Sequence, residues 1–118
     1  MERTMSGAHP TRLDLVFARW CPHCHTLSTE RARKLARALR VPLRLLDIDE
    51  PAQERVADRL VREHGDWSED YLIPQVFLQW SDGRVEHLLT GVAGSLQGTR
   101  EAWETLLRQH ARSDHPTG

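Results

Sequence analysis

The sequence predicts an α/β domain whose elements follow the order β-α-β-α-β-β-α. Three observations lead to this fold class. Two short apolar runs near the N-terminus are each followed by a segment in which apolar residues recur every three or four positions. Further along, the dipeptide Asp82-Gly83 separates two strand-like runs, which is typical of a β-hairpin. A last helix-like segment then closes the domain, which we place at residues 12–111 of the 118-residue chain.

The first half of the domain contains two predicted strand–helix pairs. Residues 13–17 form a short apolar run typical of a strand, and residues 22–39 have helical spacing, with Pro22 in the first turn. Residues 41–48 are the second predicted strand, and Pro51 opens the second predicted helix. Two successive strand–helix pairs imply that the two strands lie parallel.

The second half contains the hairpin and the closing helix. Residues 74–80 and 84–89 are its two predicted strands, because each is rich in β-branched, aromatic and other apolar side chains. Thr99 is a suitable N-cap for a helix over residues 100–110. The complete prediction is therefore an α/β sandwich.

The composition is that of an ordinary globular protein. Hydrophobic residues make up 39% and charged residues 28%, and Lys+Arg 16 nearly balances Asp+Glu 17. This balance favours neither a nucleic-acid nor a membrane partner, and we expect a monomer. Residues 1–11 and 112–118 are polar and lack periodicity, so we expect loose ends there. The first of these segments has no apolar core of a signal peptide, so we expect a cytoplasmic protein.

One local charge cluster departs from this balance. Five basic residues lie close together in and just after the first predicted helix, and at helical spacing most of them should form a solvated face. They are Arg31, Arg33, Lys34, Arg37 and Arg40.

The two cysteines of the chain, Cys21 and Cys24, form a C-x-x-C pair. A reducing compartment keeps most structural disulfides open, and so short a loop would constrain the unfolded chain little, so a chemical role is favoured. Cys21 follows a predicted strand and precedes a predicted helix, where unpaired N–H groups and the helix dipole stabilise the nucleophilic thiolate. Cys24 returns one turn later and is suited to resolve a mixed disulfide.

The two residues between the cysteines are expected to tune this chemistry. Any group that favours the thiolate over the disulfide makes the disulfide a better oxidant. The imidazole of His23 can attract the Cys21 thiolate in this way, so Pro22-His23 is predicted to set how strongly the pair oxidises.

These motifs resemble the thioredoxin superfamily over roughly residues 12–110. The match consists of Trp20 before the C-x-x-C pair, which lies between a strand and a helix, and of Ile73-Pro74 directly before a later strand. The resemblance implies a thioredoxin fold, with a mixed four-stranded sheet and helices on both faces. It also implies a cis Ile73–Pro74 bond beside the dithiol, with Trp20, Ile73 and Pro74 forming the substrate-docking surface.

Three departures from the family limit the resemblance. Leu15 stands where thioredoxins often have a buried acid, and Asp14 should point to the opposite face of the sheet. Pro22-His23 is similar to the dipeptide of periplasmic thiol oxidases. The stretch between residues 49 and 74 is longer than in a typical thioredoxin, and we expect Trp67 in it to cover core.

The resemblance implies a thiol–disulfide oxidoreductase that needs no metal or other cofactor. Its partners would be disulfide-containing proteins or small thiols, together with an unidentified reductase, and the net direction of electron flow stays open. Two other functions also fit the motif. One is c-type haem attachment at Cys21-x-x-Cys24-His25, with His25 as axial ligand. The other is a metal or iron–sulfur site that uses both thiolates, with zinc ligands drawn from His9, His23, His25 and His64.

Overall fold

The computed structural model describes residues 7–21, 23–92 and 94–114, with residues 23–25 and 111–114 described by their backbone alone. The chain is an α/β protein with a mixed four-stranded sheet, and its elements follow the predicted order. The strands are β1 (Pro10–Phe17), β2 (Leu43–Asp47), β3 (Gln75–Trp80) and β4 (Val85–Thr90). The helices are η2 (His23–Ser28), α1 (Thr29–Leu39), α2 (Pro51–His64) and α3 (Leu96–Asp114).

The strand order in the sheet is β2-β1-β3-β4. β1 and β2 are parallel, whereas β3 is antiparallel to both of its neighbours, β1 and β4. As a result β1, β2 and β4 all run in the same direction, and a helix follows each of them. These helices begin at the end of the sheet where β1 stops, which we call the Cys21 end.

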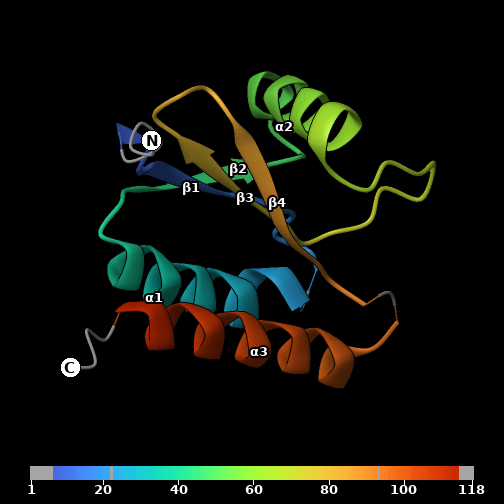
Figure 1. Ribbon diagram of the computed structural model, residues 1–118. Helices are drawn as coiled ribbons and strands as arrows, with labels where there is room; N and C mark the ends of the chain where they lie inside the picture. Colours follow the sequence, from blue (N-terminus) through green and yellow to red (C-terminus); the bar gives the residue numbers. More distant parts are fainter. Residues whose placement is uncertain (1–6, 22, 93, 115–118) are drawn as a thin grey trace.

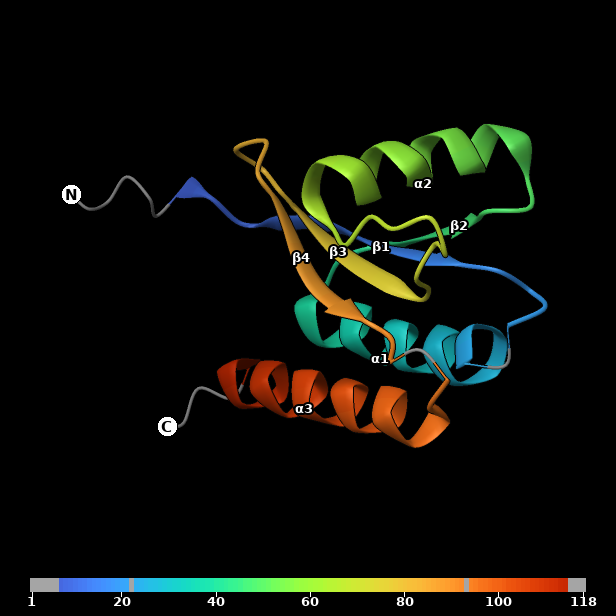
Figure 2. The ribbon, with the colours of Figure 1, turned by 90° about the vertical axis from the view of Figure 1, so that its right-hand side faces the viewer.

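The helices cover both faces of the sheet, with α1 and α3 on one face and α2 on the other (Figures 1 and 2). Two buried clusters follow from this layering. Leu13 and Leu15 pack with Trp103 on the α1–α3 side, and Val16 packs with Phe77 on the α2 side. Successive residues of β1 thus serve opposite cores, as strand geometry requires. Within the described part of the chain, no helix combines the length and the apolar character needed to cross a membrane.

β1 begins earlier than predicted. Pro10 is paired with Trp80 of β3, and the carbonyl of His9 accepts the N–H of Ser81 at 2.8 Å. Proline is acceptable at the first position of a strand, where its missing N–H costs little. The predicted loose end at residues 1–11 is therefore too long, because Pro10 and Thr11 belong to β1.

The first helix is divided into two parts, whereas the sequence predicts one continuous helix. The π-helical segment η2 covers His23–Ser28, and the α-helix α1 takes over at Thr29. π-Helical turns are rare and occur mostly as short insertions in α-helices, often at functional sites. Hydrophobic spacing does not distinguish such a turn from an α-helix. The predicted first-turn position of Pro22 lies outside the described residues.

α3 also begins before its predicted start at residue 100. Ser95 is the N-cap, because its Oγ accepts the N–H of Gly98 at 2.9 Å. The predicted cap, Thr99, is instead a buried residue within the helix. Its hydroxyl accepts the N–H of Val92 at 3.0 Å and so ties the segment before the helix to the helix itself.

The C-terminal boundary of α3 lies beyond the predicted one. The helix continues past His110 to Asp114, so its last turn occupies part of the predicted loose end at residues 112–118. The polar composition of this segment conceals the helix because it removes the apolar periodicity.

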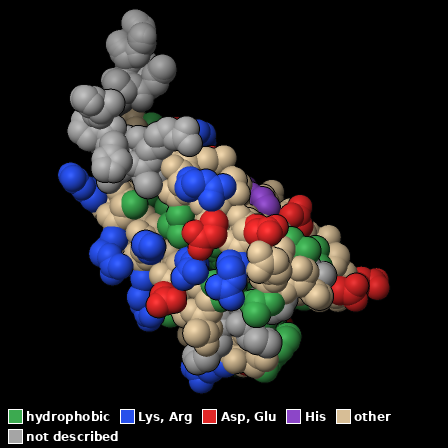
Figure 3. All heavy atoms as spheres, turned by 90° about the horizontal axis from the view of Figure 1, so that it is seen from below, with side chains coloured by type: hydrophobic (Ala, Val, Ile, Leu, Met, Phe, Trp, Pro, Cys, Tyr) green, Lys and Arg blue, Asp and Glu red, His purple; other side chains and the backbone are tan. Residues whose placement is uncertain are grey.

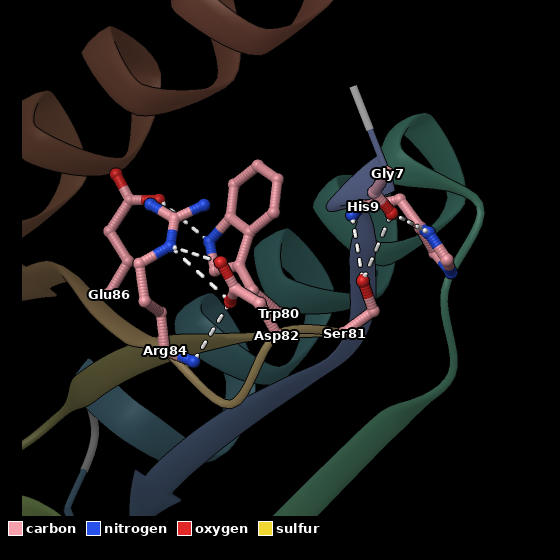
Figure 4. A network of polar contacts seen from close by, with 7 residues as sticks. All are labelled: Gly7, His9, Trp80, Ser81, Asp82, Arg84 and Glu86. Carbon is pink, nitrogen blue, oxygen red and sulfur yellow. Dashed lines mark hydrogen bonds and ion pairs between the residues drawn. The ribbon is translucent and has the colours of Figure 1, made fainter. Parts of the chain in front are cut away.

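The predicted hairpin joins β3 and β4 at the end of the sheet opposite the Cys21 end. Figure 4 shows the side-chain contacts around its turn. Gly83 has φ 92°, a left-handed conformation that glycine adopts without strain. The Trp80 indole N–H donates to Glu86 at 3.1 Å, and the Arg84 guanidinium lies 4.6 Å above the Trp80 ring. Arg84 also pairs with Asp82 at 3.0 Å. These contacts stabilise the turn and account for Trp80 as a structural residue.

Candidate functional site

Cys21 lies in the turn that follows β1. Its N–H donates to the carbonyl of Ala18 at 3.1 Å, which closes the turn. Cys21 is only 8% exposed and belongs to the core cluster on the α1–α3 side, whereas the adjacent Trp20 is 66% exposed. A nearly buried cysteine next to a large exposed aromatic ring is suited to react with a partner that first docks on the surface.

The electrostatic setting of Cys21 follows from the strand directions. Because β1, β2 and β4 run the same way, the helices that follow them all direct their N-termini toward the Cys21 end (Figure 2). A helix N-terminus carries a partial positive charge from its unpaired N–H groups. Cys21 precedes η2 in the chain and so lies at this N-terminal end.

Pro74 lies at the same end of the sheet. β3 is antiparallel to β1 and begins opposite its end, with Gln75 paired to Val16. Pro74 is buried, and Ile73 packs against both core clusters, one of which contains Cys21. The Ile73–Pro74 bond is cis, as the family resemblance implies. The structure thus brings Cys21, Ile73 and Pro74 together from distant parts of the chain.

Gly91 holds Pro74 from the β4 side. Its N–H donates to the Pro74 carbonyl at 2.8 Å, and a Cβ at this position would lie 2.5 Å from Pro74 Cδ. Among the described glycines only Gly83 and Gly94 have positive φ, so residue 91 needs glycine for space and not for its backbone conformation. Any side chain here would displace the proline.

Gln75 is a site-forming residue that the sequence prediction did not identify. Its side chain is fully buried and makes three hydrogen bonds to the backbone of the loop between α2 and β3. The amide donates to the carbonyls of Asp66 and Leu72 at 3.0 and 2.9 Å and accepts the N–H of Asp66 at 3.0 Å. The sequence holds no specific signal for this role, because the strand contains two glutamines, Gln75 and Gln79, and their spacing does not show which of them holds a loop.

A second polar cluster holds the same loop against β4. The Thr90 hydroxyl donates to Asp66 Oδ2 at 2.7 Å and lies 2.8 Å from His87 Nε2. Because the hydroxyl has one proton and gives it to the carboxylate, Nε2 must be the donor toward Thr90. Thr90 pairs with Gln75 in the sheet, so both clusters support the backbone beside Pro74.

Trp67 does not cover core in the predicted way. It is 41% exposed, with the Arg62 guanidinium 3.7 Å above its ring and the Tyr71 ring edge-on at 5.5 Å. Tyr71, and not Trp67, packs against the core cluster on the α2 side. The tryptophan is therefore the outer layer of a small stack that has Tyr71 underneath.

Tyr71 has a perturbed hydroxyl. The Tyr71 hydroxyl and Asp58 Oδ1 are both buried, and neither has a well-aligned hydrogen bond to another described residue. Burial raises the pKa of Tyr71 well above its ordinary value, and the Asp58 carboxylate raises it further through a hydrogen-bonding contact and its charge. This tyrosine stays neutral throughout the physiological range.

Asp14 lies on the face predicted for it. Leu15 occupies the same core cluster as Cys21, so the acid found there in many thioredoxins has no counterpart at that position. Asp14 is fully buried on the other side of β1, where two arginines and an amide surround its carboxylate. Arg12, Arg44 and Gln79 each donate to it at 2.9–3.0 Å. A carboxylate satisfied in this way is a structural feature.

The remaining predicted site residues can be placed only in part. The side chains of Pro22, His23, Cys24 and His25 lie outside the described residues. Two of the proposed zinc ligands are described: His9 precedes β1, whose far end leads to Cys21, and His64 contacts Glu63 at 3.7 Å on α2. α2 lies on the sheet face opposite α1, and His64 is its last residue, whereas its first residue is the one near the Cys21 end (Figure 1). His9 and His64 therefore both lie away from Cys21. The side chains that the structure describes form no cluster of three or more potential metal ligands.

Comparisons with known proteins provide no family for this chain. Neither a protein-family model nor a curated protein matches it. One similar solved structure is described as that of a malarial protein, with a TM-score of 0.47 and 19% sequence identity. The similarity covers 84% of this chain and 94% of that one. Similarity at this level decides neither the fold family nor the function.

Proposed function

We propose that this protein is a thiol–disulfide oxidoreductase of the thioredoxin fold, with Cys21 as nucleophile and Cys24 as resolving thiol. The observation that carries the proposal is the position of Cys21, which follows β1, precedes a helix and lies at the same end of the sheet as the buried Pro74. These elements come from separate parts of the chain and meet at one end of the sheet. A purely structural cysteine would need neither the helix start nor the adjacent exposed Trp20.

The proposed reaction has two steps. The Cys21 thiolate attacks a partner disulfide, so that one partner sulfur joins Cys21 and the other leaves as a thiolate. Cys24 then loses its proton and attacks the Cys21 sulfur, which releases the second partner sulfur. Two electrons pass to the partner, its thiolates take up two protons, and Cys21 and Cys24 are left as a disulfide. A reductase or a small thiol must reverse this oxidation before the next cycle.

The described residues control access to Cys21 and offer a surface on which a partner can dock. The near burial of Cys21 restricts reaction to partners that dock closely. Trp20 offers an exposed apolar surface for docking. Ile73-Pro74 is proposed to complete the docking surface, as the family resemblance implies. Pro22-His23 is proposed to tune the reduction potential, as expected from the sequence.

Trapping of the mixed disulfide tests the proposal directly. The Cys24→Ser variant should accumulate a covalent adduct with a disulfide-bonded probe protein, because nothing displaces the partner from Cys21. The Cys21→Ser variant should form no adduct, and the doubly substituted chain is the blank. Adducts are measured by non-reducing electrophoresis and by intact mass.

Each alternative result has a definite meaning. Adducts with Cys21→Ser but not with Cys24→Ser would refute the assignment of the two roles. If the reduced wild-type protein exchanges neither with the probe protein nor with oxidised glutathione, the proposed function itself is wrong.

A further inference from the structure

The exposed side of α1 carries a stripe of positive charge. Arg33, Arg37 and Arg40 are spaced at i, i+4 and i+7, which places them on one side of the helix, and Lys34 lies next to them. All four side chains are exposed, and no ion pair joins any of them to another described residue. We call these four residues the α1 stripe. Seen from the α1–α3 side, Lys and Arg side chains gather on one part of the surface (Figure 3).

The charge of α1 is unlike that of the rest of the molecule. α1 contains four basic residues and one acidic residue, Glu30, which already pairs with Arg31 at 3.4 Å. α2, of similar amphipathic design, contains three arginines and three acidic residues. The whole chain has a net charge of −1. The excess of positive charge is therefore a local property of α1.

Local folding does not explain the stripe. Like charges at i and i+4 destabilise a helix, and Arg33 and Lys34 lie too far from the C-terminus of α1 to gain from its dipole. Arg40 is the C-cap and has φ 60° and ψ 44°, a left-handed conformation that favours glycine. An arginine at this position costs stability that a glycine would not.

We propose that the α1 stripe binds an acidic surface on the protein partner whose disulfide exchanges with Cys21. This inference rests on the proposed function and specifies its substrate class. α1 continues directly from η2, so the stripe begins roughly 15–20 Å from Cys21 along the helix. An ordinary protein interface, at about 800 Å² per partner and roughly 30 Å across, spans both.

The surface near the stripe fits a protein better than a nucleic acid. The described part of α1 has no exposed aromatic side chain on which a base could stack. Instead, exposed Trp20, Val92 and Leu96 supply apolar contact area at the Cys21 end. Two surface hollows also lie in the seam between the first helix and α3. Basic residues outnumber acidic ones in the lining of each, with Arg31 and Arg100 against Glu30 in one and Lys34 and Arg108 against Glu104 in the other.

Electrostatic attraction of this kind acts mainly on the rate of encounter. Complementary charges raise the association rate at low ionic strength, and salt screens the effect within about 10 Å at 0.1 M. The stripe should therefore accelerate exchange with acidic partners in a salt-dependent way, without changing the chemistry at Cys21.

Two synthetic peptides test the inference. They share one intramolecular disulfide and differ only in the residues around it, glutamates in one peptide and glutamines in the other. The reduced full-length protein should reduce the acidic peptide about tenfold faster at low salt, and the difference should shrink as salt is raised. Arg33→Glu/Arg37→Glu should abolish the preference.

The chain offers a matched control on α2. Arg55 and Arg59 are also exposed and spaced at i and i+4, so Arg55→Glu/Arg59→Glu makes the same charge change on the opposite face of the sheet. This variant should keep the preference. Arg40→Gly should raise the thermal unfolding midpoint and yet weaken the preference, since it removes a charge and relieves the left-handed backbone.

The outcomes separate this inference from the proposed function. Equal rates for the two peptides, or an equal loss of preference in the α1 and α2 variants, would overturn the role of the stripe while leaving the exchange reaction intact. Stripe-dependent binding of a single-stranded DNA oligonucleotide at physiological salt, without preference for the acidic peptide, would overturn it in favour of a nucleic-acid partner. Failure to reduce either peptide would overturn the proposed function, and this inference with it.

Discussion

Replacement of Gly91 by alanine should damage both stability and reactivity, because this glycine lies directly against Pro74. The new Cβ would lie 2.5 Å from Pro74 Cδ and 3.2 Å from both Pro74 Cγ and Pro74 N. A proline ring is rigid and part of the backbone, so it cannot rotate away as a long side chain would. The backbone of residues 74 and 91 must move apart instead, which strains the hydrogen bond between them.

The size of the effect follows from two opposing terms. Overpacking of a well-packed position costs about 1–3 kcal/mol. Alanine also restricts the unfolded chain, and where the native backbone is compatible this stabilises by about 0.4–1 kcal/mol. We therefore expect a net loss of about 1–2 kcal/mol of unfolding free energy, a factor of roughly 5–30 in the folded-to-unfolded ratio.

Gly83→Ala is the matched control. Nothing lies within 4 Å of a Cβ at this position, but its φ of 92° is unfavourable for alanine. It should cost a similar amount, roughly 1–2 kcal/mol, by a purely conformational route. Because Gly83 lies in the hairpin at the end of the sheet away from Cys21, this variant should keep the rate of exchange.

Two measurements decide the question. Chemical denaturation gives the unfolding free energy of each variant, and the second-order rate constant with oxidised glutathione reports on the site. Gly91→Ala should lose both stability and rate, whereas Gly83→Ala should lose stability alone. A Gly91→Ala variant with the unfolding free energy and the exchange rate of the wild type, or an equal loss of rate in both variants, would refute the reasoning.

Two further predictions concern the loop between α2 and β3. Tyr71 is the single tyrosine of the chain, so ultraviolet absorbance should show its titration midpoint well above the ordinary pKa of about 10. Since the folded pKa is raised, the contribution of Tyr71 to stability is complete below pH ~10 and is lost as pH rises toward the folded value. Tyr71→Phe should therefore reduce the loss of stability at alkaline pH. An unshifted titration midpoint would contradict the buried environment of Tyr71. Gln75→Leu should cost about 2–4 kcal/mol, because it removes three hydrogen bonds to loop backbone. Hydrogen exchange should then accelerate at Asp66, and unchanged protection there would show that Gln75 does not hold the loop.

Much of the fold could be predicted because its signals are local. The strand over residues 13–17 and the helix that begins at Pro51 each show their periodicity within a few residues, and both are observed. Asp82-Gly83 predicts the turn that is observed, because the turn requires a positive φ and glycine tolerates it. The boundaries were less accurate where the signal is not apolar spacing, as at Ser95, whose role as N-cap depends on a single hydrogen bond.

The prediction for the site was partial for a similar reason. The C-x-x-C pair is visible in the sequence, and the importance of Pro74 followed from family resemblance and not from its neighbours in the chain. Gln75 was missed because a buried amide looks, in sequence, like any polar residue in a strand. Only the position of the loop shows that it faces three backbone groups.

The sequence by itself determined the order of the elements, the position of Cys21 between a strand and a helix, and the concentration of positive charge on α1. Each of these depends on residues that are neighbours along the chain. Only the tertiary structure decided that Pro74 and Gly91 meet near the end of β1, and that Arg33 and Arg37, unlike Arg31, lack carboxylate partners among the described residues. The reason is that such contacts depend on strand order and register, which arise when distant segments bury their apolar faces together.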